Sequence, residues 1–288
     1  MGLVSDIRTA AKGNGTTIQT SDAAALEKLF NQMFYLPKVP EAETAFVRQV
    51  MTRGLETAER AGLHASALTT GDKQFCLRQQ ALSLKYKQLQ GEQVAPPLRR
   101  IFAEGDAVHE KWQRLFLRAG YAEVEGLDKT CFNTQYRISF TPDILCYIPQ
   151  FFEGCMVGEL KSVNTYQYAK MSRHPSAWKQ CQFYMHLKIA EEKKAGAWNG
   201  VDWTKGFVLS EDKNTQQFKL EVYEYDPTMV QPFVDRAKAV KQAYKAMVKS
   251  GVDAIPRPSD ASGPACKRCH DCPMHDACWN VGMGRVDL

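Results

Sequence analysis

Two short apolar runs, close together in the chain, most constrain what it can fold into. The first spans residues 144–148 and follows Asp143, and the second spans residues 155–160 and leads into Lys161. Both runs have the length and the apolar content of a β-strand, and Gly154 between them predicts a turn. We therefore expect the two runs to pair as a hairpin.

The alternation of side chains along a strand decides which of them share a face. Glu159 and Lys161 are two residues apart, so they point to the same side, whereas Leu160 points into the core. If the hairpin closes in register, Asp143 lies beside Glu159. The sequence therefore predicts two carboxylates and an ammonium at one place on a sheet.

This group of charges suits a divalent cation. Carboxylates are hard ligands for Mg²⁺ or Mn²⁺, and a bound cation lowers the pKa of its water and stabilises charge on a phosphate under attack. A lysine beside it can hold or deprotonate the attacking water and offset negative charge. The alternative is a surface aspartate and a Glu–Lys pair on a solvated strand. The Pro142-Asp143 sequence between apolar runs favours the metal site.

Length and charge set wider bounds. The chain has 288 residues and a formal net charge of +5, which fits a nucleic-acid partner but does not establish one. It contains no apolar run of transmembrane length, and residues 1–20 lack the apolar segment of a signal peptide. We expect a cytoplasmic protein that has no membrane partner.

The nine cysteines are unevenly distributed. An odd number in a chain without a secretory signal argues against a disulfide framework. Cys-x-x-Cys spacing near the C-terminus lets two thiolates reach one metal centre, and both zinc and an iron–sulfur cluster accept such ligands. The clustered cysteines are Cys266, Cys269, Cys272 and Cys278, and the ones expected to be buried thiols are Cys131, Cys146, Cys155 and Cys181.

The remaining chain is expected to contain both helices and strands. His109 lies at the edge of the apolar stripe of a helix over 98–119, as either a ligand or an ordinary packing residue, and Gly105 favours a close approach of another group. The basic and aromatic segment 164–175 is either a DNA contact or an exposed loop. Other expected helices span 23–33, 41–61, 176–190 and 227–250, and other expected strands span 121–125, 137–148, 206–210 and 218–225.

Six short motifs, taken in order, resemble a known family. A helical Gly-x-x-x-His, Pro-Asp, Glu-x-Lys and a helical Gln-x-x-x-Tyr are the pattern of the RecB-like branch of the PD-(D/E)xK nucleases. An early Cys-x-Arg and a late Cys-x-x-Cys-x5-Cys resemble its iron–sulfur subgroup, which includes CRISPR-adaptation nucleases and AddB-type nuclease domains. The motif residues are Cys76, Arg78, Gly105, His109, Pro142, Asp143, Glu159, Lys161, Gln180, Tyr184, Cys269, Cys272 and Cys278.

The resemblance covers about residues 75–279 and implies an α/β fold. Its core would be restriction-endonuclease-like, a central mixed sheet flanked by helices, with a helical N-terminal region. A tail and helical region would occupy residues 1–70, the nuclease core residues 71–255, and the cysteine cluster residues 256–288.

The resemblance also implies roles for single residues. His109, Asp143 and Glu159 would be ligands of Mg²⁺ or Mn²⁺, together with the Leu160 carbonyl. Lys161 would position the nucleophilic water. The residues that would orient the site and its substrate are Gln180 and Tyr184.

The cysteines allow two cofactors. By the resemblance, a [4Fe–4S] cluster would be held by Cys76 and three C-terminal cysteines, Cys269, Cys272 and Cys278, and would be structural. The extra Cys266 departs from the family pattern. It leaves open a local Zn²⁺ site made of Cys266, Cys269, Cys272 and Cys278, with Cys76 free.

The function implied is metal-dependent hydrolysis of DNA phosphodiesters, as an exonuclease on single strands or ends. Recombination, repair, phage replication and CRISPR adaptation are all compatible settings. The chain has no Gly-x-x-x-x-Gly-Lys-Ser/Thr motif, so an unwinding partner would be a separate helicase chain; a recombinase or integrase is another possible partner. The alternatives are a DNA-binding accessory module that works through a partner and a zinc-stabilised binding protein, both without stand-alone catalysis.

Overall fold

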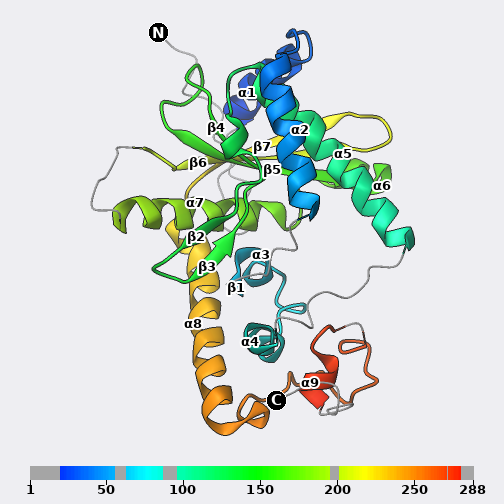
Figure 1. Cartoon of the computed structure of the whole chain (residues 1–288), viewed down its shortest axis with the longest axis vertical. Helices are drawn as coiled ribbons and strands as arrows, with labels where there is room; N and C mark the ends of the chain where they lie inside the picture. The colour runs from blue at the N-terminus through cyan, green and yellow to red at the C-terminus, as the bar shows by residue number, and fades with distance from the viewer. Residues whose placement is uncertain (1–19, 56–62, 87–95, 195–200, 271, 280–288) are drawn as a thin grey trace.

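The computed structural model describes residues 20–55, 63–86, 96–194, 201–270 and 272–279 (Figure 1). A mixed sheet lies between helical layers, so the predicted α/β class is confirmed. The described helices are α1 (Thr20–Met33), α2 (Pro40–Leu55), α3 (Ala65–Leu68), α4 (Leu77–Lys85), α5 (Pro96–Arg118), α6 (Thr165–Lys170), α7 (Ala177–Lys194), α8 (Pro227–Ser250) and α9 (His275–Trp279), with single 3-10 turns η2 (Val124–Gly126) and η3 (Val252–Ala254).

The main sheet has the order β4-β5-β6-β7. The predicted hairpin is present, because β4 (Ile144–Tyr147) pairs antiparallel with β5 (Cys155–Val163). After β5 the chain crosses through α7, and β6 (Lys205–Asp212) pairs parallel with β5. The last strand, β7 (Phe218–Glu224), pairs antiparallel with β6, and both strands lie where the sequence predicted them.

A smaller sheet has the order β1-β3-β2. Its strands are β1 (Leu63–His64), β2 (Cys131–Asn133) and β3 (Ile138–Phe140), with β1 parallel to β3. The prediction of one strand over 137–148 was wrong, because the chain leaves the ladder between β3 and β4. Pro142 lies at this break, and a proline has no N–H to donate to a ladder.

One other expectation also needs correction. Residues 121–125, predicted as a strand, instead form a loop that enters η2. The helix predicted over 41–61 is present as α2 as far as Leu55, and residues 56–62 lie outside the described residues. The segment 164–175, predicted to be either a DNA contact or an exposed loop, contains the short helix α6, which Asn164 caps with its side chain.

Helices α1 and α5 cover one face of the main sheet (Figure 1). The apolar stripe of α5 is buried there through Trp112 and Phe116. Phe30 of α1 packs edge-on against Phe116, at 5.0 Å between ring centroids, and against Phe207 of β6, at 5.5 Å. The N-terminal helix therefore contributes directly to the core under the sheet.

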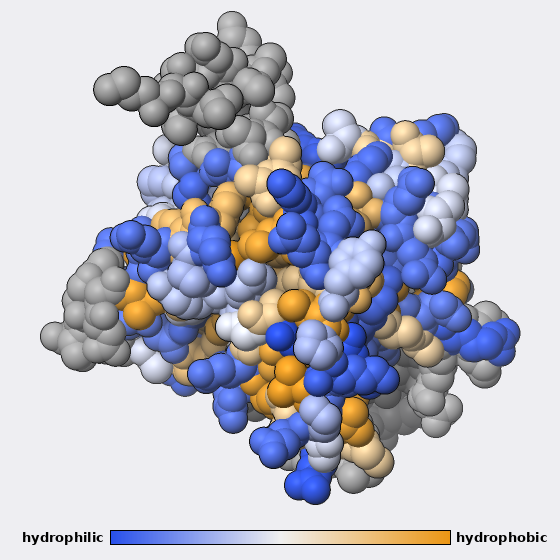
Figure 2. All heavy atoms as spheres, turned by 90° about the horizontal axis from the view of Figure 1, so that it is seen from above, coloured by the Kyte–Doolittle hydropathy of each residue, from blue (hydrophilic) through white to orange (hydrophobic). Residues whose placement is uncertain are grey.

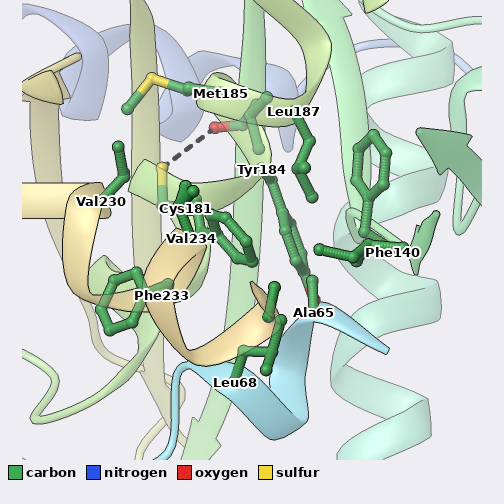
Figure 3. Packing of buried hydrophobic residues seen from close by; sticks show 14 of the residues in the cluster. Ala65, Leu68, Phe140, Cys181, Tyr184, Met185, Leu187, Val230, Phe233 and Val234 are labelled. Atoms are coloured by element: carbon green, nitrogen blue, oxygen red, sulfur yellow. Dashed lines mark hydrogen bonds between the residues drawn. The ribbon is translucent and has the colours of Figure 1, made fainter. Parts of the chain in front are cut away.

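Helix α7 covers the opposite face (Figure 3). The Cys181 thiol donates to the Val157 carbonyl of β5 at 3.7 Å, and Phe183 packs on Phe233 of α8 at 5.6 Å. A Cβ on Gly206 would lie 2.6 Å from the Cys181 sulfur. The absence of a side chain at Gly206 therefore lets α7 approach β6 closely. Cys131, Cys146 and Cys181 are buried as predicted, whereas Cys155 is half-buried.

A third hydrophobic cluster joins the cysteine-rich segment around α9 to helix α4. Leu82 of α4, Met247 of α8, Ala277 of α9 and Met274, just before α9, bury their side chains together. These elements form the lower end of the molecule, away from the main sheet (Figure 1). The cysteine-rich segment is thereby packed against the start of α4, about 190 residues earlier in the chain.

Among the described helices, none is long and apolar enough to span a lipid bilayer. Seen from above, hydrophobic atoms reach the surface in small separate groups between hydrophilic residues (Figure 2). The large apolar side chains most exposed in the described structure include Tyr35, Met51 and Val248.

Candidate active site

The register of the β4–β5 hairpin builds the centre of the site. Ile144 pairs with Gly158, so Asp143, one residue before β4, comes to lie beside Glu159. The backbone N–H of Leu160 donates to Oδ2 of Asp143 at 2.7 Å. The side chain of Leu160 is buried on the other face of the sheet, in the core under α5. The predicted juxtaposition of the two carboxylates is therefore present.

Lys161 completes the group. Its Nζ lies 2.8 Å from Oε2 of Glu159 and 3.5 Å from Oδ2 of Asp143. Burial would lower the pKa of Lys161, but the two carboxylates outweigh it and raise that pKa above its usual value. Lys161 therefore remains an ammonium across the physiological range.

Glu159 is the most buried of the three charged side chains, with 2% of its surface exposed. Burial raises the pKa of Glu159 to about 8, Asp143 adds to the rise, and the Lys161 ammonium opposes it. Its second oxygen, Oε1, is buried and has no hydrogen-bond partner among the described residues. In the absence of a cation, burial therefore disfavours the ionised form of Glu159, and the Lys161 ammonium partly offsets this.

His109 of α5 lies at the rim of this group. Its Nδ1 is 3.6 Å from Oδ1 of Asp143, the oxygen that the Leu160 N–H does not use. Asp128, which the sequence reasoning missed, lies beside both residues, and its N–H donates to the Asp143 carbonyl at 3.1 Å. Ligand atoms of His109, Asp128 and Asp143 all lie within 4.8 Å of one another, which makes them a candidate cation site.

Asp128 carries no local sequence signal because its position depends on the turn that holds it. Its φ is 43°, in the left-handed region that aspartate tolerates better than most residues. The preceding residue, Leu127, forms an isolated bridge with Ile144. That bridge places Asp128 at the start of β4, next to Asp143.

Helix α5, which carries His109, is anchored to the sheet by polar contacts. The buried Glu211 of β6 accepts from Lys111 Nζ and from Trp112 Nε1, both at 2.6 Å. Gln113 donates to the Asp143 carbonyl at 2.9 Å. Among the described residues nothing approaches Gly105 closely, since a Cβ there would meet no heavy atom within 4 Å.

The predicted Gln180 and Tyr184 lie on α7, beneath the site. Gln180 is half-buried, and Tyr184 is buried in the apolar cluster with its ring 5.5 Å from that of Phe140 (Figure 3). Burial raises the pKa of Tyr184, and Glu159 and Asp143 add to this. Tyr184 is therefore a neutral residue under the carboxylates, and it does not line the surface.

The chain entering α7 brings His174 near Lys161. Burial, reinforced by the Lys161 charge, lowers the pKa of His174 to about 4. Its Nδ1 accepts from the backbone N–H groups of Ser176 and Ala177, which caps α7, and the backbone N–H of His174 donates to Glu221 Oε1 at 2.7 Å. Arg173 lies over the ring of Trp178. This segment is therefore ordered by its own contacts and carries basic and aromatic groups beside the site.

The cysteines form a second candidate site, far from the first. Cys76, Cys269, Cys272 and Cys278 line one cavity of about 50 Å³, and Cys266 is not among the residues that line it. Burial, followed by the neighbouring thiols, raises the pKa of Cys272 to about 11. The structure therefore brings the distant Cys76 to the C-terminal cysteines.

Arg78 explains why an arginine follows Cys76 by two residues. It is almost fully buried and donates to the Ile255 carbonyl, to the Cys278 carbonyl at 3.0 Å and to Asp253 at 3.1 Å. Nearby, Arg268 donates to the Phe75 carbonyl at 2.8 Å. These contacts fasten the start of α4 to the cysteine-rich segment.

Comparisons with known proteins give structural likenesses only. No protein-family model matches the chain, and no curated protein matches it. The crystal structure of an alkaline exonuclease, LHK-Exo, from Laribacter hongkongensis is similar, with 16% identity, a TM-score of 0.45, and coverage of 67% of this chain and 92% of that one. Its complex with dAMP gives 15% identity, the same coverage and a TM-score of 0.45. A crystal structure of SSO0001 gives 14% identity, a TM-score of 0.42, and coverage of 77% and 97%.

Proposed function

We propose that the chain is a metal-dependent deoxyribonuclease, a phosphodiester hydrolase with a PD-(D/E)xK-type core. The observation that carries the proposal is the hairpin register, which holds Asp143, Glu159 and Lys161 in contact at the start of β4. His109 and Asp128 at the rim add an imidazole and a third carboxylate. Oxygen and imidazole ligands of this kind suit Mg²⁺ or Mn²⁺.

The state of Glu159 supports a cation at this place. A buried carboxyl with an unpartnered oxygen is unfavourable in a protein interior unless a positive charge shares it. Asp143 and Glu159 would hold the cation, with His109, Asp128 and the Leu160 carbonyl as further ligands. When bound, the cation would lower the pKa of a coordinated water and stabilise negative charge on the phosphate.

The role of Lys161 follows from its charge. In the metal-free protein Asp143 and Glu159 raise the pKa of Lys161, and as an ammonium it would donate to the attacking water or to a phosphate oxygen. It would therefore orient the water and offset negative charge. Gln180, in the first turn of α7, would contact substrate. Tyr184, buried one turn later, would support the two carboxylates from the protein interior.

DNA is proposed as the substrate, cleaved from an end or on a single strand. The motifs that resemble the RecB-like nucleases support this choice. Support also comes from the ordered segment before α7, where Arg173 and Lys170 lie over aromatic rings beside the site. Basic groups of this kind contact phosphates, and aromatic groups stack on bases. A separate helicase, recombinase or integrase chain would supply any unwinding or targeting.

A [4Fe–4S] cluster is proposed for the cysteine cavity, with Cys76, Cys269, Cys272 and Cys278 as ligands. The cavity lining supports this choice, because the distant Cys76 lines the cavity with the three C-terminal cysteines, whereas Cys266 does not. Four thiolates are the usual ligands of such a cluster.

Buried donors around the cavity support an anionic occupant. Arg257 Nε is buried without a partner among the described residues, the Trp279 indole lies within hydrogen-bond reach of Cys269, and both side chains line the cavity. Thiolates and sulfides would accept hydrogen bonds from these donors. The cluster would be structural, because Lys161 and the carboxylates lie elsewhere.

The test is degradation of end-labelled single-stranded and double-stranded DNA by anaerobically purified protein with Mn²⁺ or Mg²⁺. We expect cleavage by the wild type and a loss of at least a hundredfold in Lys161→Ala. Lys241→Ala, which removes a lysine far from the carboxylates, is the control. Protein with its cysteine-bound group intact that cleaves no substrate with either cation would contradict the proposal. Rescue by a partner chain would then favour the accessory DNA-binding module.

A further inference from the structure

Ser210 of β6 lies in one row with two lysines of the main sheet. Its pairing partner on β5 is Lys161, and its pairing partner on β7 is Lys219. Paired residues on neighbouring strands present their side chains to the same face. The serine hydroxyl therefore lies between two ammonium-bearing side chains, on the face that carries the carboxylates.

The hydroxyl of Ser210 has no hydrogen bond in the structure. The side chain is completely buried, and its Oγ has no partner among the described residues. Buried hydroxyls are usually hydrogen-bonded, since leaving one unpaired costs free energy. The packing in this structure therefore does not explain a serine at position 210. A hydrogen-bond partner that reaches the hydroxyl in another state of the site would explain it.

Of the two flanking lysines, only Lys161 is in a position to change partners. Nζ of Lys219 already donates to the Tyr168 carbonyl at 2.5 Å and to the Met171 carbonyl at 2.8 Å, both in the segment around α6. Nζ of Lys161 instead contacts Glu159 and Asp143. A cation held by these carboxylates would compete for the same oxygen lone pairs.

We infer that Ser210 is a positioning residue for Lys161, whose hydroxyl accepts a hydrogen bond from the Lys161 ammonium once a cation engages Asp143 and Glu159. This inference rests on the proposed function. A lysine ammonium has three N–H groups, so one can bind Ser210 while another faces the attacking water. The hydroxyl would thus replace a carboxylate oxygen as acceptor and fix the direction of the Lys161 side chain.

The experiment compares Ser210→Ala and the near-isosteric Ser210→Cys with wild type. Melting temperatures are measured for the metal-free protein and after saturation with Mn²⁺ alone, and kcat and KM are measured on end-labelled DNA. The matched control is Ser139→Ala, another buried serine, whose hydroxyl donates to the Leu63 carbonyl at 3.4 Å in the smaller sheet.

We expect the metal-free Ser210 variants to be as stable as wild type or more stable, because the hydroxyl that they lack makes no hydrogen bond in the metal-free protein. The rise in melting temperature on adding Mn²⁺ should be smaller than in wild type, and kcat should fall about tenfold with little change in KM. Ser139→Ala should lose stability equally with and without Mn²⁺ and keep its kcat.

Two results would overturn the inference in distinguishable ways. If wild type cleaves DNA but both Ser210 variants keep its kcat and its response to Mn²⁺, Ser210 is a packing residue and the proposed function stands. If wild type itself shows neither cleavage nor a thermal response to Mn²⁺, the proposed function and this inference both fail.

Discussion

The backbone N–H of Leu160 is bonded to Oδ2 of Asp143 at 2.7 Å, which fixes the aspartate against the neighbouring strand. The same oxygen lies 3.5 Å from Lys161, while Oδ1 faces His109 at 3.6 Å. One oxygen of Asp143 is thus used to hold the site together, and the other is turned toward the imidazole and Asp128. This division makes Oδ1 the better placed atom for a cation.

Asp128 should contribute to cation affinity although no motif includes it. Asp128→Asn removes one charge from a three-ligand group, and we expect the dissociation constant for Mn²⁺ to rise at least tenfold. Titration calorimetry with Mn²⁺ on protein whose cysteine site is loaded measures this directly. Asp106→Asn, an exposed carboxylate on α5, is the control. An unchanged affinity in the Asp128 variant would remove Asp128 from the site.

Glu159 should make the metal-free protein less stable as the pH rises. The pKa of Glu159 is raised from 4.5 to about 8, so the folded state holds this proton more tightly than the unfolded state. Its contribution to stability is therefore present below about pH 4.5 and is lost as the pH rises toward 8. Glu159→Gln, which stays neutral, should remove this dependence.

The measurement is the free energy of unfolding of chelator-treated protein between pH 5 and 8. We expect wild type to lose stability relative to Glu159→Gln by an amount on the order of a few kcal/mol. Adding Mn²⁺ should reduce the difference for wild type, because the cation favours the ionised carboxylate. Parallel stability curves for the two proteins would show that Glu159 is ionised even without a cation.

The anchor of α5 should matter for both stability and catalysis. Glu211→Ala leaves the Trp112 N–H and the Lys111 ammonium without their acceptor, and we expect a loss of about 2–4 kcal/mol. Because His109 lies on the same helix, Mn²⁺ affinity should fall as well. Glu110→Ala, which removes only a surface pair with Arg114 at 3.4 Å, should cost less than about 1 kcal/mol. Unfolding by denaturant, which gives the free energy of unfolding of each variant, measures the two losses of stability.

The iron–sulfur hypothesis and the local zinc hypothesis differ in which cysteine variant loses its bound metal. Cys76→Ala should lose most of its iron and visible absorbance and should melt at a lower temperature, because Cys76 lines the cavity. Cys266→Ala should keep its iron, since Cys266 does not. Metal analysis of anaerobically purified proteins checks both. Stoichiometric zinc in wild type, lost in Cys266→Ala and kept in Cys76→Ala, would establish the local zinc site instead.

The sequence by itself determined the hairpin and the central charges of the site. Period-two alternation is a local property, so the positions of Glu159 and Lys161 on one face, and of Leu160 on the other, could be read from residues alone. The long helix α8 was equally readable, because Asp226 caps its start and Gly251 ends it. Local patterns and short turns suffice where neighbours in the chain are neighbours in space.

Only the tertiary structure decided the rest of the site. Asp128 reaches Asp143 through a bridge between Leu127 and Ile144, and Ser210 meets Lys161 through a parallel pairing across α7. The break at Pro142, which divides one expected strand between two sheets, likewise depends on partners distant in sequence. Alternation along a strand decides which side chains face the core, but which strands pair when they are far apart in the chain depends on how the layers pack.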